Sequence, residues 1–201
     1  FNNMKTLMES WRHYLKEQNS PLAVVYFGGF KPPHKGHLAV VEEYLSMPDV
    51  ERVYILFGYS PRRSSDGSII LDGSHSQAVW DIFISTLPQS DKVTVLPPTR
   101  SNTMVSAAEL AWLPELAGRR ITAGFGAKEP KYGNSFVQVV KSLTKEKGAP
   151  TATAVAVPST VNLPAVSSTK IRNALASKDK KYLEQIVPDG VSVQEYINTL
   201  S

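Results

Sequence analysis

Two histidines, His34 and His37, lie three residues apart in a stretch rich in glycine and proline that runs from Gly28 to His37. The apolar run before this stretch predicts a buried strand, and the apolar run after it predicts a helix. Glycines at such a junction let the backbone approach a ligand closely. The N–H groups of the first helical turn, together with the helix dipole, favour negative charge. With Lys31 and Lys35 nearby, the pattern predicts a site that holds an anion.

A second stretch of similar character, V-S-S-T-K-I-R, ends at Arg172. Ser167, Ser168 or Thr169 can cap the helix expected to follow, whose first N–H groups and hydroxyls would form another anion site. Lys170 and Arg172 add positive charge, and an arginine can bind a phosphate through two parallel hydrogen bonds. Taken alone, a hydroxyl cap followed by basic residues most often marks only a helix start.

The first stretch, G-G-F-K-P-P-H-K-G-H, resembles the HxGH signature of the nucleotidylyltransferase superfamily. The second resembles the I-S-S-T-x-I-R motif that this superfamily carries in the same place, with Val166 instead of isoleucine. The two motifs occur in the family's order, about 130 residues apart, and the resemblance in strand order extends from Ala23 to Leu175. The sequence S-S-T-K-I-R is closer to the corresponding motif of adenylyltransferases than to that of cytidylyltransferases, so the resemblance favours ATP over CTP.

The resemblance implies a reaction in which the phosphate of an acceptor attacks the α-phosphorus of a nucleoside triphosphate and pyrophosphate leaves. The second pKa of a phosphate monoester is about 6, so the nucleophile is ionised near neutral pH and needs no general base. The site must then align the reactants and neutralise charge on the equatorial and leaving oxygens. Mg²⁺ is expected to arrive bound to the triphosphate. Zinc is not expected, because no third ligand stands beside the two histidines.

The resemblance also implies roles for individual residues. Those expected to act in catalysis are His34, His37 and Arg172, with His37 stabilising the transition state and Arg172 binding the β- and γ-phosphates. Those expected to bind the nucleotide are Gly28, Gly29, Phe30, Lys31, Gly36, Gly124, Gly126, Lys128, Ser167, Ser168 and Thr169. Arg62 and Arg63 could reach the phosphate of the acceptor, or they could be exposed loop residues without a chemical role. The G-F-G loop at Gly124 lacks the aspartate that adenylyltransferases often carry there, so the identities of the nucleobase and of the acceptor stay open.

Short apolar runs rich in valine and isoleucine, without strict alternation, predict parallel strands buried on both faces. The expected strands are Ala23–Phe27, Arg52–Phe57, Lys92–Leu96, Arg120–Gly124 and Ala152–Val157. The expected helices are His37–Ser46, Ser76–Leu87, Ser106–Ala117, Ser135–Lys145, Thr169–Ala176, Lys180–Ile186 and Ser192–Leu200. This order predicts a single Rossmann-like, doubly wound α/β sheet of about five parallel strands with helices on both faces. Such sheets bind ligands beyond the carboxyl ends of their strands.

The first residues carry a separate pattern. Leu7, Met8, Trp11 and Leu15 recur at three- and four-residue spacing and predict an amphipathic helix over Met4–Gln18. This helix would pack on the main domain, on an identical subunit in a homo-oligomer, or on another protein. We therefore expect an N-terminal helix within residues 1–20 and one α/β domain over residues 21–201.

Composition narrows the class of protein. The chain has 201 residues, of which 42% are hydrophobic and 20% charged, which is enough for one domain with a sizeable core. The absence of cysteine excludes disulfides, thiolate metal sites and cysteine nucleophiles. No apolar run reaches membrane-spanning length, so we expect no membrane partner and a cytoplasmic location. The net charge of +4 suits a binder of phosphates, while no dense block of Lys and Arg points to nucleic acid.

Three alternatives stay open at this stage. The chain could be a nucleotide-binding module without turnover that docks on a larger assembly through its N-terminal helix. It could be a cytidylyltransferase. It could also be an RNA-related enzyme, since class I aminoacyl-tRNA synthetases share a related histidine motif, although the chain is short for one and shows no obvious anticodon-binding domain.

Overall fold

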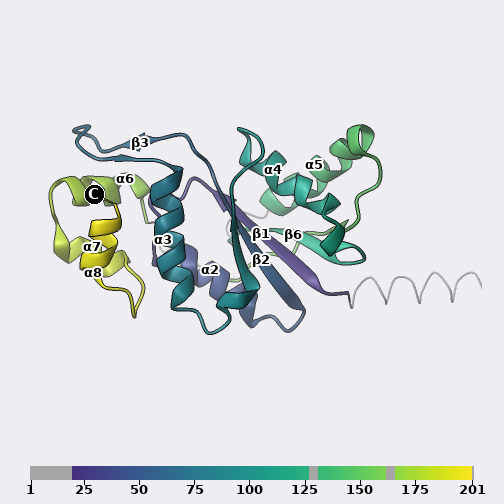
Figure 1. Ribbon diagram of the computed structural model, residues 1–201, viewed down its shortest axis with the longest axis horizontal. Coiled ribbons are helices and arrows are strands. Elements are labelled where there is room, and N and C mark those ends of the chain that lie inside the picture. The colour runs from purple at the N-terminus through teal and green to yellow at the C-terminus, as the bar shows by residue number, and fades with distance from the viewer. Residues whose placement is uncertain (1–19, 127–130, 162–165, 201) are drawn as a thin grey trace, which may run out of the picture.

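A five-stranded parallel sheet forms the centre of the structure, a computed structural model that describes residues 20–126, 131–161 and 166–200. Its strands are β1 (Leu22–Gly28), β2 (Val50–Phe57), β5 (Val93–Leu96), β6 (Arg120–Gly124) and β7 (Thr153–Ala154). They lie in the spatial order β5-β2-β1-β6-β7 (Figure 1), and every pairing between neighbours is parallel. The predicted α/β fold with about five parallel strands is therefore confirmed.

The central strand β1 shows why the sheet is covered on both faces. Successive side chains of a strand point to opposite faces, and here both sets are apolar. Leu22 and Val24 enter one hydrophobic core, Ala23 and Val25 enter the other, and all four are buried. Because burial of apolar surface contributes about 25 cal/mol per Å², each face of the sheet stabilises a layer of helices.

The helices form two layers, one on each face of the sheet (Figure 1). On one side, α2 (Lys35–Ser46) and α3 (Gly73–Ser85) lie next to the sheet, and α6 (Ser168–Ala176), α7 (Lys180–Ile186) and α8 (Val193–Thr199) lie outside α3 (Figure 1). The other layer contains α4 (Thr103–Glu109) and α5 (Lys131–Lys147).

The order of the strands reverses direction at β1. The chain first builds β1, β2 and β5 outward with α2 and α3 between them, and later places β6 and β7 on the opposite side of β1. The loops that leave β1 and β6 therefore run to different faces of the sheet. In open α/β sheets this switch point, outside the carboxyl ends of the strands, is where ligands bind.

Side-chain caps determine where the helices begin. His34 is the N-cap of α2: its Nδ1 accepts the N–H of Gly36, while Nδ1 of His37 accepts the N–H of His34, both at 3.2 Å. Asp72 caps α3 and Ser167 caps α6 through side-chain oxygens. Since each cap satisfies N–H groups that the first turn leaves unpaired, these helices begin slightly before the positions predicted from the sequence.

The helix predicted over Ser106–Ala117 was too long. Helix α4 ends at Glu109, and the 3-10 turns η2 (Leu110–Trp112) and η3 (Pro114–Leu116) follow. Pro114 cannot continue a helix, and the residue before it, Leu113, is extended. A third turn, η1 (Ser90–Lys92), precedes β5.

Two other connections differ from the prediction. The strand predicted over Ala152–Val157 is regular only at β7, because beyond Ala154 the segment bonds to β6 irregularly: Val157 donates its N–H to the side-chain oxygen of Thr122 and not to a backbone carbonyl. The polar stretch after β2, predicted as a loop, contains a short antiparallel hairpin of β3 (Arg62–Arg63) and β4 (Ile70–Leu71). The predicted N-terminal helix lies outside the described residues. Within those residues, no helix is long and apolar enough to cross a membrane.

Candidate active site

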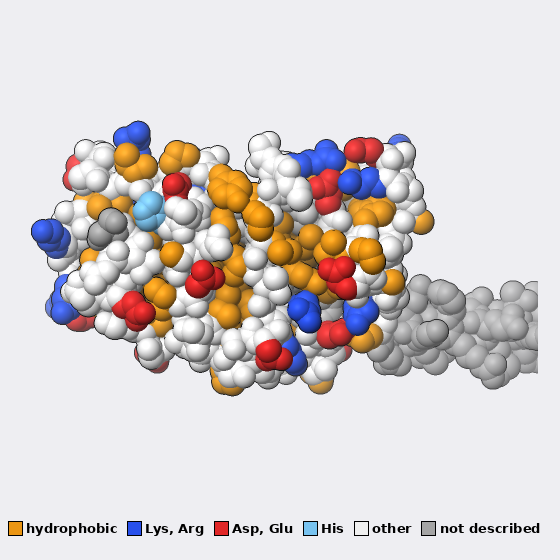
Figure 2. Space-filling model, viewed as in Figure 1, with side chains coloured by type: hydrophobic (Ala, Val, Ile, Leu, Met, Phe, Trp, Pro, Cys, Tyr) orange, Lys and Arg blue, Asp and Glu red, His pale blue; other side chains and the backbone are white. Residues whose placement is uncertain are grey.

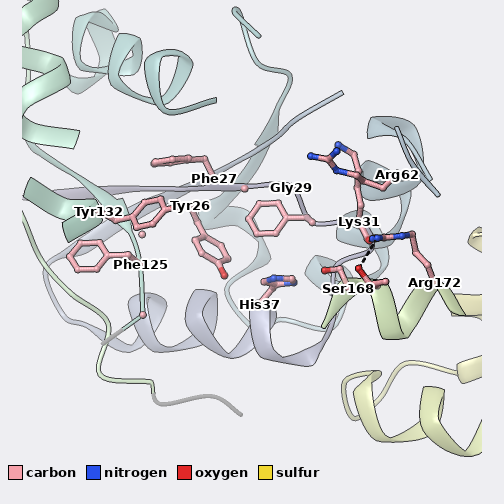
Figure 3. A pocket seen from close by; sticks show the side chains of 15 residues that line it. Tyr26, Phe27, Gly29, Lys31, His37, Arg62, Phe125, Tyr132, Ser168 and Arg172 are labelled. Atoms are coloured by element: carbon pink, nitrogen blue, oxygen red, sulfur yellow. Dashed lines mark hydrogen bonds between the residues drawn. The ribbon is translucent and has the colours of Figure 1, made fainter. Parts of the chain in front are cut away.

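A cleft of about 440 Å³ opens at the carboxyl ends of β1 and β6 (Figure 3). This is the switch point of the sheet, where a ligand site was expected. Eleven of its fifteen lining residues belong to the set expected from the sequence, namely Gly28, Gly29, Phe30, Lys31, His37, Arg62, Gly124, Gly126, Ser168, Thr169 and Arg172. The two sequence motifs therefore meet in one cleft.

The loop between β1 and α2 is fixed by hydrogen bonds from three helices on one side of the sheet. The carbonyl oxygen of Phe30 accepts a hydrogen bond from Ser76 of α3, and that of Lys31 accepts one from Arg172 of α6. The carbonyl oxygen of Pro33 accepts one from Tyr196 of α8, and the three donor–acceptor distances are 2.7 to 2.8 Å. With these carbonyls bonded to the protein, the N–H groups of Gly29, Phe30 and Lys31 donate to no other described residue. Such fixed donors can bind negative charge without reorientation.

Phe30 sits in a backbone conformation that is uncommon for a residue other than glycine, with φ of 42°. Its ring packs edge-on against Trp80, with centroids 5.3 Å apart, and against His37 at 4.9 Å. This packing stabilises the turn. It also places an apolar wall beside the His37 imidazole.

The two imidazoles of the first motif lie one on the other, with ring centroids 3.7 Å apart. In each ring Nδ1 accepts a backbone N–H, so the proton of the neutral ring is on Nε2. Burial lowers the pKa of His34 to about 4, and burial together with His34 lowers the pKa of His37 well below its usual value. Both rings are therefore neutral at pH 7. His37 lines the cleft and can donate its Nε2–H to an anion.

Arg172 is more enclosed than its expected role implies. Only 8% of the residue is exposed, and its guanidinium donates to the carbonyls of Lys31 and Arg63 and to Thr169 Oγ1. Three of its five N–H groups are thus used to join the first loop, the hairpin and α6. Arg172 therefore lines a cleft whose loop it also holds in place.

Three cationic side chains, Lys31, Arg62 and Arg172, line one end of the cleft, and none of the fifteen described lining residues is acidic. Desolvation and the charge of Arg62 lower the pKa of Lys31, against a smaller opposite effect of Asp72. Desolvation and Arg62 also lower the pKa of Arg172. Because these cations repel one another, a bound anion would relieve an existing unfavourable interaction.

Four aromatic residues that the sequence argument missed, Tyr26, Phe27, Phe125 and Tyr132, line the other end of the cleft (Figure 3). The rings of Phe27 and Tyr132 lie 6.3 Å apart. Aromatic faces of this kind suit a planar ring such as a nucleobase. Two of them could have been predicted from their position in the sequence, because Phe27 and Phe125 each lie next to a glycine at the end of a strand.

Four expected residues do not line the cleft. His34, Gly36 and Ser167 lie behind it in the caps of α2 and α6, where they orient the lining residues. The side chain of Arg63 is exposed, and only its carbonyl takes part by accepting from Arg172. Lys128 lies outside the described residues.

A metal ion held by the protein alone does not fit this site. Across the described ranges, no group of three or more His, Cys, Asp or Glu side chains could hold a metal ion. Mg²⁺ prefers carboxylate oxygens, and the described lining has only the hydroxyls of Ser168, Thr169 and two tyrosines besides backbone oxygens. A magnesium ion that arrives on a triphosphate would need no such ligands.

Comparison with solved structures finds a similarity to the nicotinic acid mononucleotide adenylyltransferase of Plasmodium falciparum complexed with APC. The TM-score is 0.50, with 13% sequence identity over 89% of this chain and 95% of that chain. The chain shares the α/β fold of that adenylyltransferase. At this identity the similarity establishes the fold alone, and it agrees with the resemblance seen in the two motifs.

Two further solved structures are also similar to this chain. A bifunctional NMN adenylyltransferase/ADP ribose pyrophosphatase from Francisella tularensis has a TM-score of 0.47 and 15% identity, and the match covers 90% of this chain and 48% of that chain. Thermotoga maritima TmcAL bound with alpha-thio ATP has a TM-score of 0.48 and 12% identity, covering 90% of this chain and 55% of that chain. No family model matches the chain, and a search of curated proteins found no match either.

Proposed function

We propose that this protein is a nucleotidylyltransferase that transfers a nucleoside monophosphate to a phosphorylated small-molecule acceptor and releases pyrophosphate. The observation that carries the proposal is the meeting of His37, the loop Gly28–Lys31 and the N-terminus of α6 in one cleft at the switch point. Each of the three supplies N–H donors, hydroxyls or positive charge, and the described lining contains no acidic residue.

The reaction requires little covalent chemistry from the protein. An oxygen of the acceptor phosphate forms a bond to the α-phosphorus, the bond from that phosphorus to the α,β-bridging oxygen breaks, and pyrophosphate leaves with that oxygen. A phosphate monoester is already largely ionised at pH 7, so neutral histidines do not need to act as bases. His37 would instead donate its Nε2–H to phosphate oxygens, and the loop N–H groups, Ser168, Thr169 and Lys31 would stabilise the remaining charge.

The two ends of the cleft suggest how the substrates divide it. The cationic end suits the triphosphate and the phosphate of the acceptor, with the exposed side chain of Arg62 available to the acceptor. The aromatic end suits the base. We favour ATP over CTP on the wording of the second motif. Mononucleotides are the acceptors to test first, because the similar Plasmodium falciparum structure is of a nicotinic acid mononucleotide adenylyltransferase. Magnesium would enter with the triphosphate, where it neutralises phosphate charge.

The test is pyrophosphate release in the presence of Mg²⁺ with each of the four NTPs and a pool of phosphorylated metabolites. We expect release with ATP that depends on the pool, and a loss of about 100-fold or more in kcat for His37→Ala. His75→Ala is the matched control, since His75 only completes the cap of α3 and does not line the cleft.

The outcomes separate the alternatives. Release with CTP alone would make the chain a cytidylyltransferase. ATP binding without pyrophosphate release, whichever acceptor is present, would favour a nucleotide-binding module. The hydrogen bonds of the Arg172 guanidinium to other residues of the protein are also compatible with that role. Absence of both binding and release would reject the proposed function.

A further inference from the structure

The segment that follows β7 leaves the sheet gradually as it approaches the cleft, since Val155 and Val157 still donate their N–H groups to β6, at Ile121 O (2.9 Å) and Thr122 Oγ1 (3.0 Å). The ladder between β6 and β7 ends at Ala154. The segment nevertheless continues to Val161, whose carbonyl oxygen lies 3.7 Å from the position that a Cβ on Gly126 would occupy. Gly126 lines the cleft, so the placement of the segment 155–161 affects the wall of the site. Beyond Val157, contacts outside the sheet hold this segment.

One such contact is the hydroxyl of Tyr44, a fully buried residue of α2. It donates to the carbonyl of Val157 at 2.8 Å and accepts the N–H of Phe125 at 3.3 Å. A single hydroxyl thereby joins the loop after β6 to the segment after β7. The two segments are also joined directly, because Ser159 donates its N–H to the carbonyl of Phe125 at 3.0 Å.

The second contact is the carboxylate of Glu43, the preceding residue of α2. It accepts the N–H groups of Thr160 at 2.7 Å and of Val161 at 3.1 Å, and the hydroxyls of Ser159 and Thr160. Four donors from three consecutive residues thus converge on one ionised side chain. Hydrogen bonds to a charged acceptor are the stronger kind, so this contact can fix the end of the segment.

We propose that Glu43 and Tyr44 are positioning residues that set the wall of the cleft formed by Phe125 and Gly126 against the histidines. The same helix carries His37 in its first turn and Glu43 six residues later, about 9 Å along its axis. Helix α2 therefore works as a rigid bracket that joins the two halves of the site across the switch point. The description of this wall as a nucleotide site rests on the proposed function.

The first measurement is hydrogen–deuterium exchange of the full chain without any ligand. Glu43→Gln keeps the shape of the side chain but turns an N–H donor toward the donors of Thr160 and Val161. Tyr44→Phe keeps the ring and removes the bridging hydroxyl. Glu42→Gln, an exposed neighbour on the same helix, is the matched control. We expect faster exchange over residues 155–161 in both variants, extending to Phe125 and Gly126 in Tyr44→Phe, with α2 itself and the control unchanged.

The second measurement is the ATP dependence of pyrophosphate release, supported by equilibrium binding of ATP. We expect the KM and the dissociation constant for ATP to rise about tenfold in Glu43→Gln, with kcat changed less than threefold. A merely structural defect would instead lower the fraction of active protein and leave KM unchanged.

The two proposals fail in different ways. Unchanged exchange over residues 155–161 in Glu43→Gln, or unchanged affinity for ATP despite faster exchange, would overturn the bracket while leaving the proposed function intact. If the wild-type chain binds no nucleotide, the proposed function fails. Faster exchange over residues 155–161 that extends to Phe125 and Gly126 in Tyr44→Phe would then still support the bracket as the device that places this wall, whereas exchange that never reaches Phe125 and Gly126 would overturn it.

Discussion

At the scale of single residues, His34 and His37 act as helix caps as well as candidate ligands of phosphate. The capping box uses Nδ1 of both rings, which leaves Nε2–H as the outward donor. Burial holds both pKa values below the usual value for histidine. The local structure of the motif therefore prepares neutral donors, which is the form that a reaction without a general base requires.

The lowered pKa of His34 predicts a dependence of stability on pH. Between pH 6.5 and the folded-state pKa of about 4, the unfolded chain binds a proton that the folded chain does not, so stability falls as the pH falls through this window. We expect the free energy of unfolding to drop by about 2 kcal/mol from this residue between pH 7.5 and pH 5. Urea unfolding at the two pH values measures it. His34→Asn, which keeps a capping oxygen but does not titrate, should show a smaller drop, and an equal drop would contradict the assignment.

Arg62 and Arg63 provide a matched pair on one strand of the hairpin. Arg62 lines the cleft, whereas the side chain of Arg63 is exposed elsewhere. Replacing Arg62 by alanine should raise the KM for the acceptor about tenfold, as expected for the loss of a charge-assisted hydrogen bond, with little change in thermal stability. Arg63→Ala should leave KM unchanged. Steady-state kinetics with the acceptor varied separate the two, and equal effects would remove Arg62 from the site.

At the scale of elements, the loop after β1 is shaped by helices that are distant in sequence. Helices α3, α6 and α8 each donate one hydrogen bond to a carbonyl of this loop. The last of these donors comes from α8, which contributes no residue to the described lining of the cleft. Helix α8 is thus connected to the candidate site through the loop that it supports.

Tyr196→Phe tests this support. The change keeps the ring, which stacks on Phe83 at 6.1 Å, and leaves the carbonyl of Pro33 without its donor. We expect the free energy of unfolding to fall by about 1–2 kcal/mol and kcat to fall several-fold, because the loop loses a fixed point next to the histidines. Tyr182→Phe is the control, since the hydroxyl of Tyr182 bonds to no described residue. A loss of stability without any change in kcat would limit α8 to a structural role.

At the scale of the whole molecule, the strand order decides where the chemistry lies. A sheet that reverses direction at β1 brings residues from both ends of the chain to one cleft. Charge is unevenly distributed along this cleft, with Lys31, Arg62 and Arg172 at one end and aromatic rings at the other. Figure 2 shows, by contrast, basic and acidic side chains interspersed on the face that it presents.

This concentration of positive charge predicts that pyrophosphate stabilises the folded chain. A ligand that binds only the folded state adds about 2.7 kcal/mol at a hundred times its dissociation constant. Thermal unfolding with increasing pyrophosphate should show a rising midpoint, and the rise should shrink in high salt and in Lys31→Ala. A rise of equal size in Lys31→Ala would mean that pyrophosphate binds elsewhere.

The sequence by itself determined the fold and the two motifs of this protein. Short apolar runs without alternation favour parallel strands covered on both faces, and this property is local to each strand. Glycines, histidines and hydroxyl caps mark anion sites by their types and spacing, and the resemblance of the two motifs to the nucleotidylyltransferase superfamily allowed eleven cleft residues to be named in advance.

The tertiary structure alone decided which of these residues face the cleft and which support it. Arg172 and His34 look like ligands in the sequence, yet their contacts also make them an anchor and a cap. Tyr44, Glu43 and Tyr196 show no signal in the sequence, because a buried hydroxyl or a surface carboxylate gains its meaning from partners more than 80 residues away. Such long-range contacts depend on how elements pack, and spacing along the chain does not encode them.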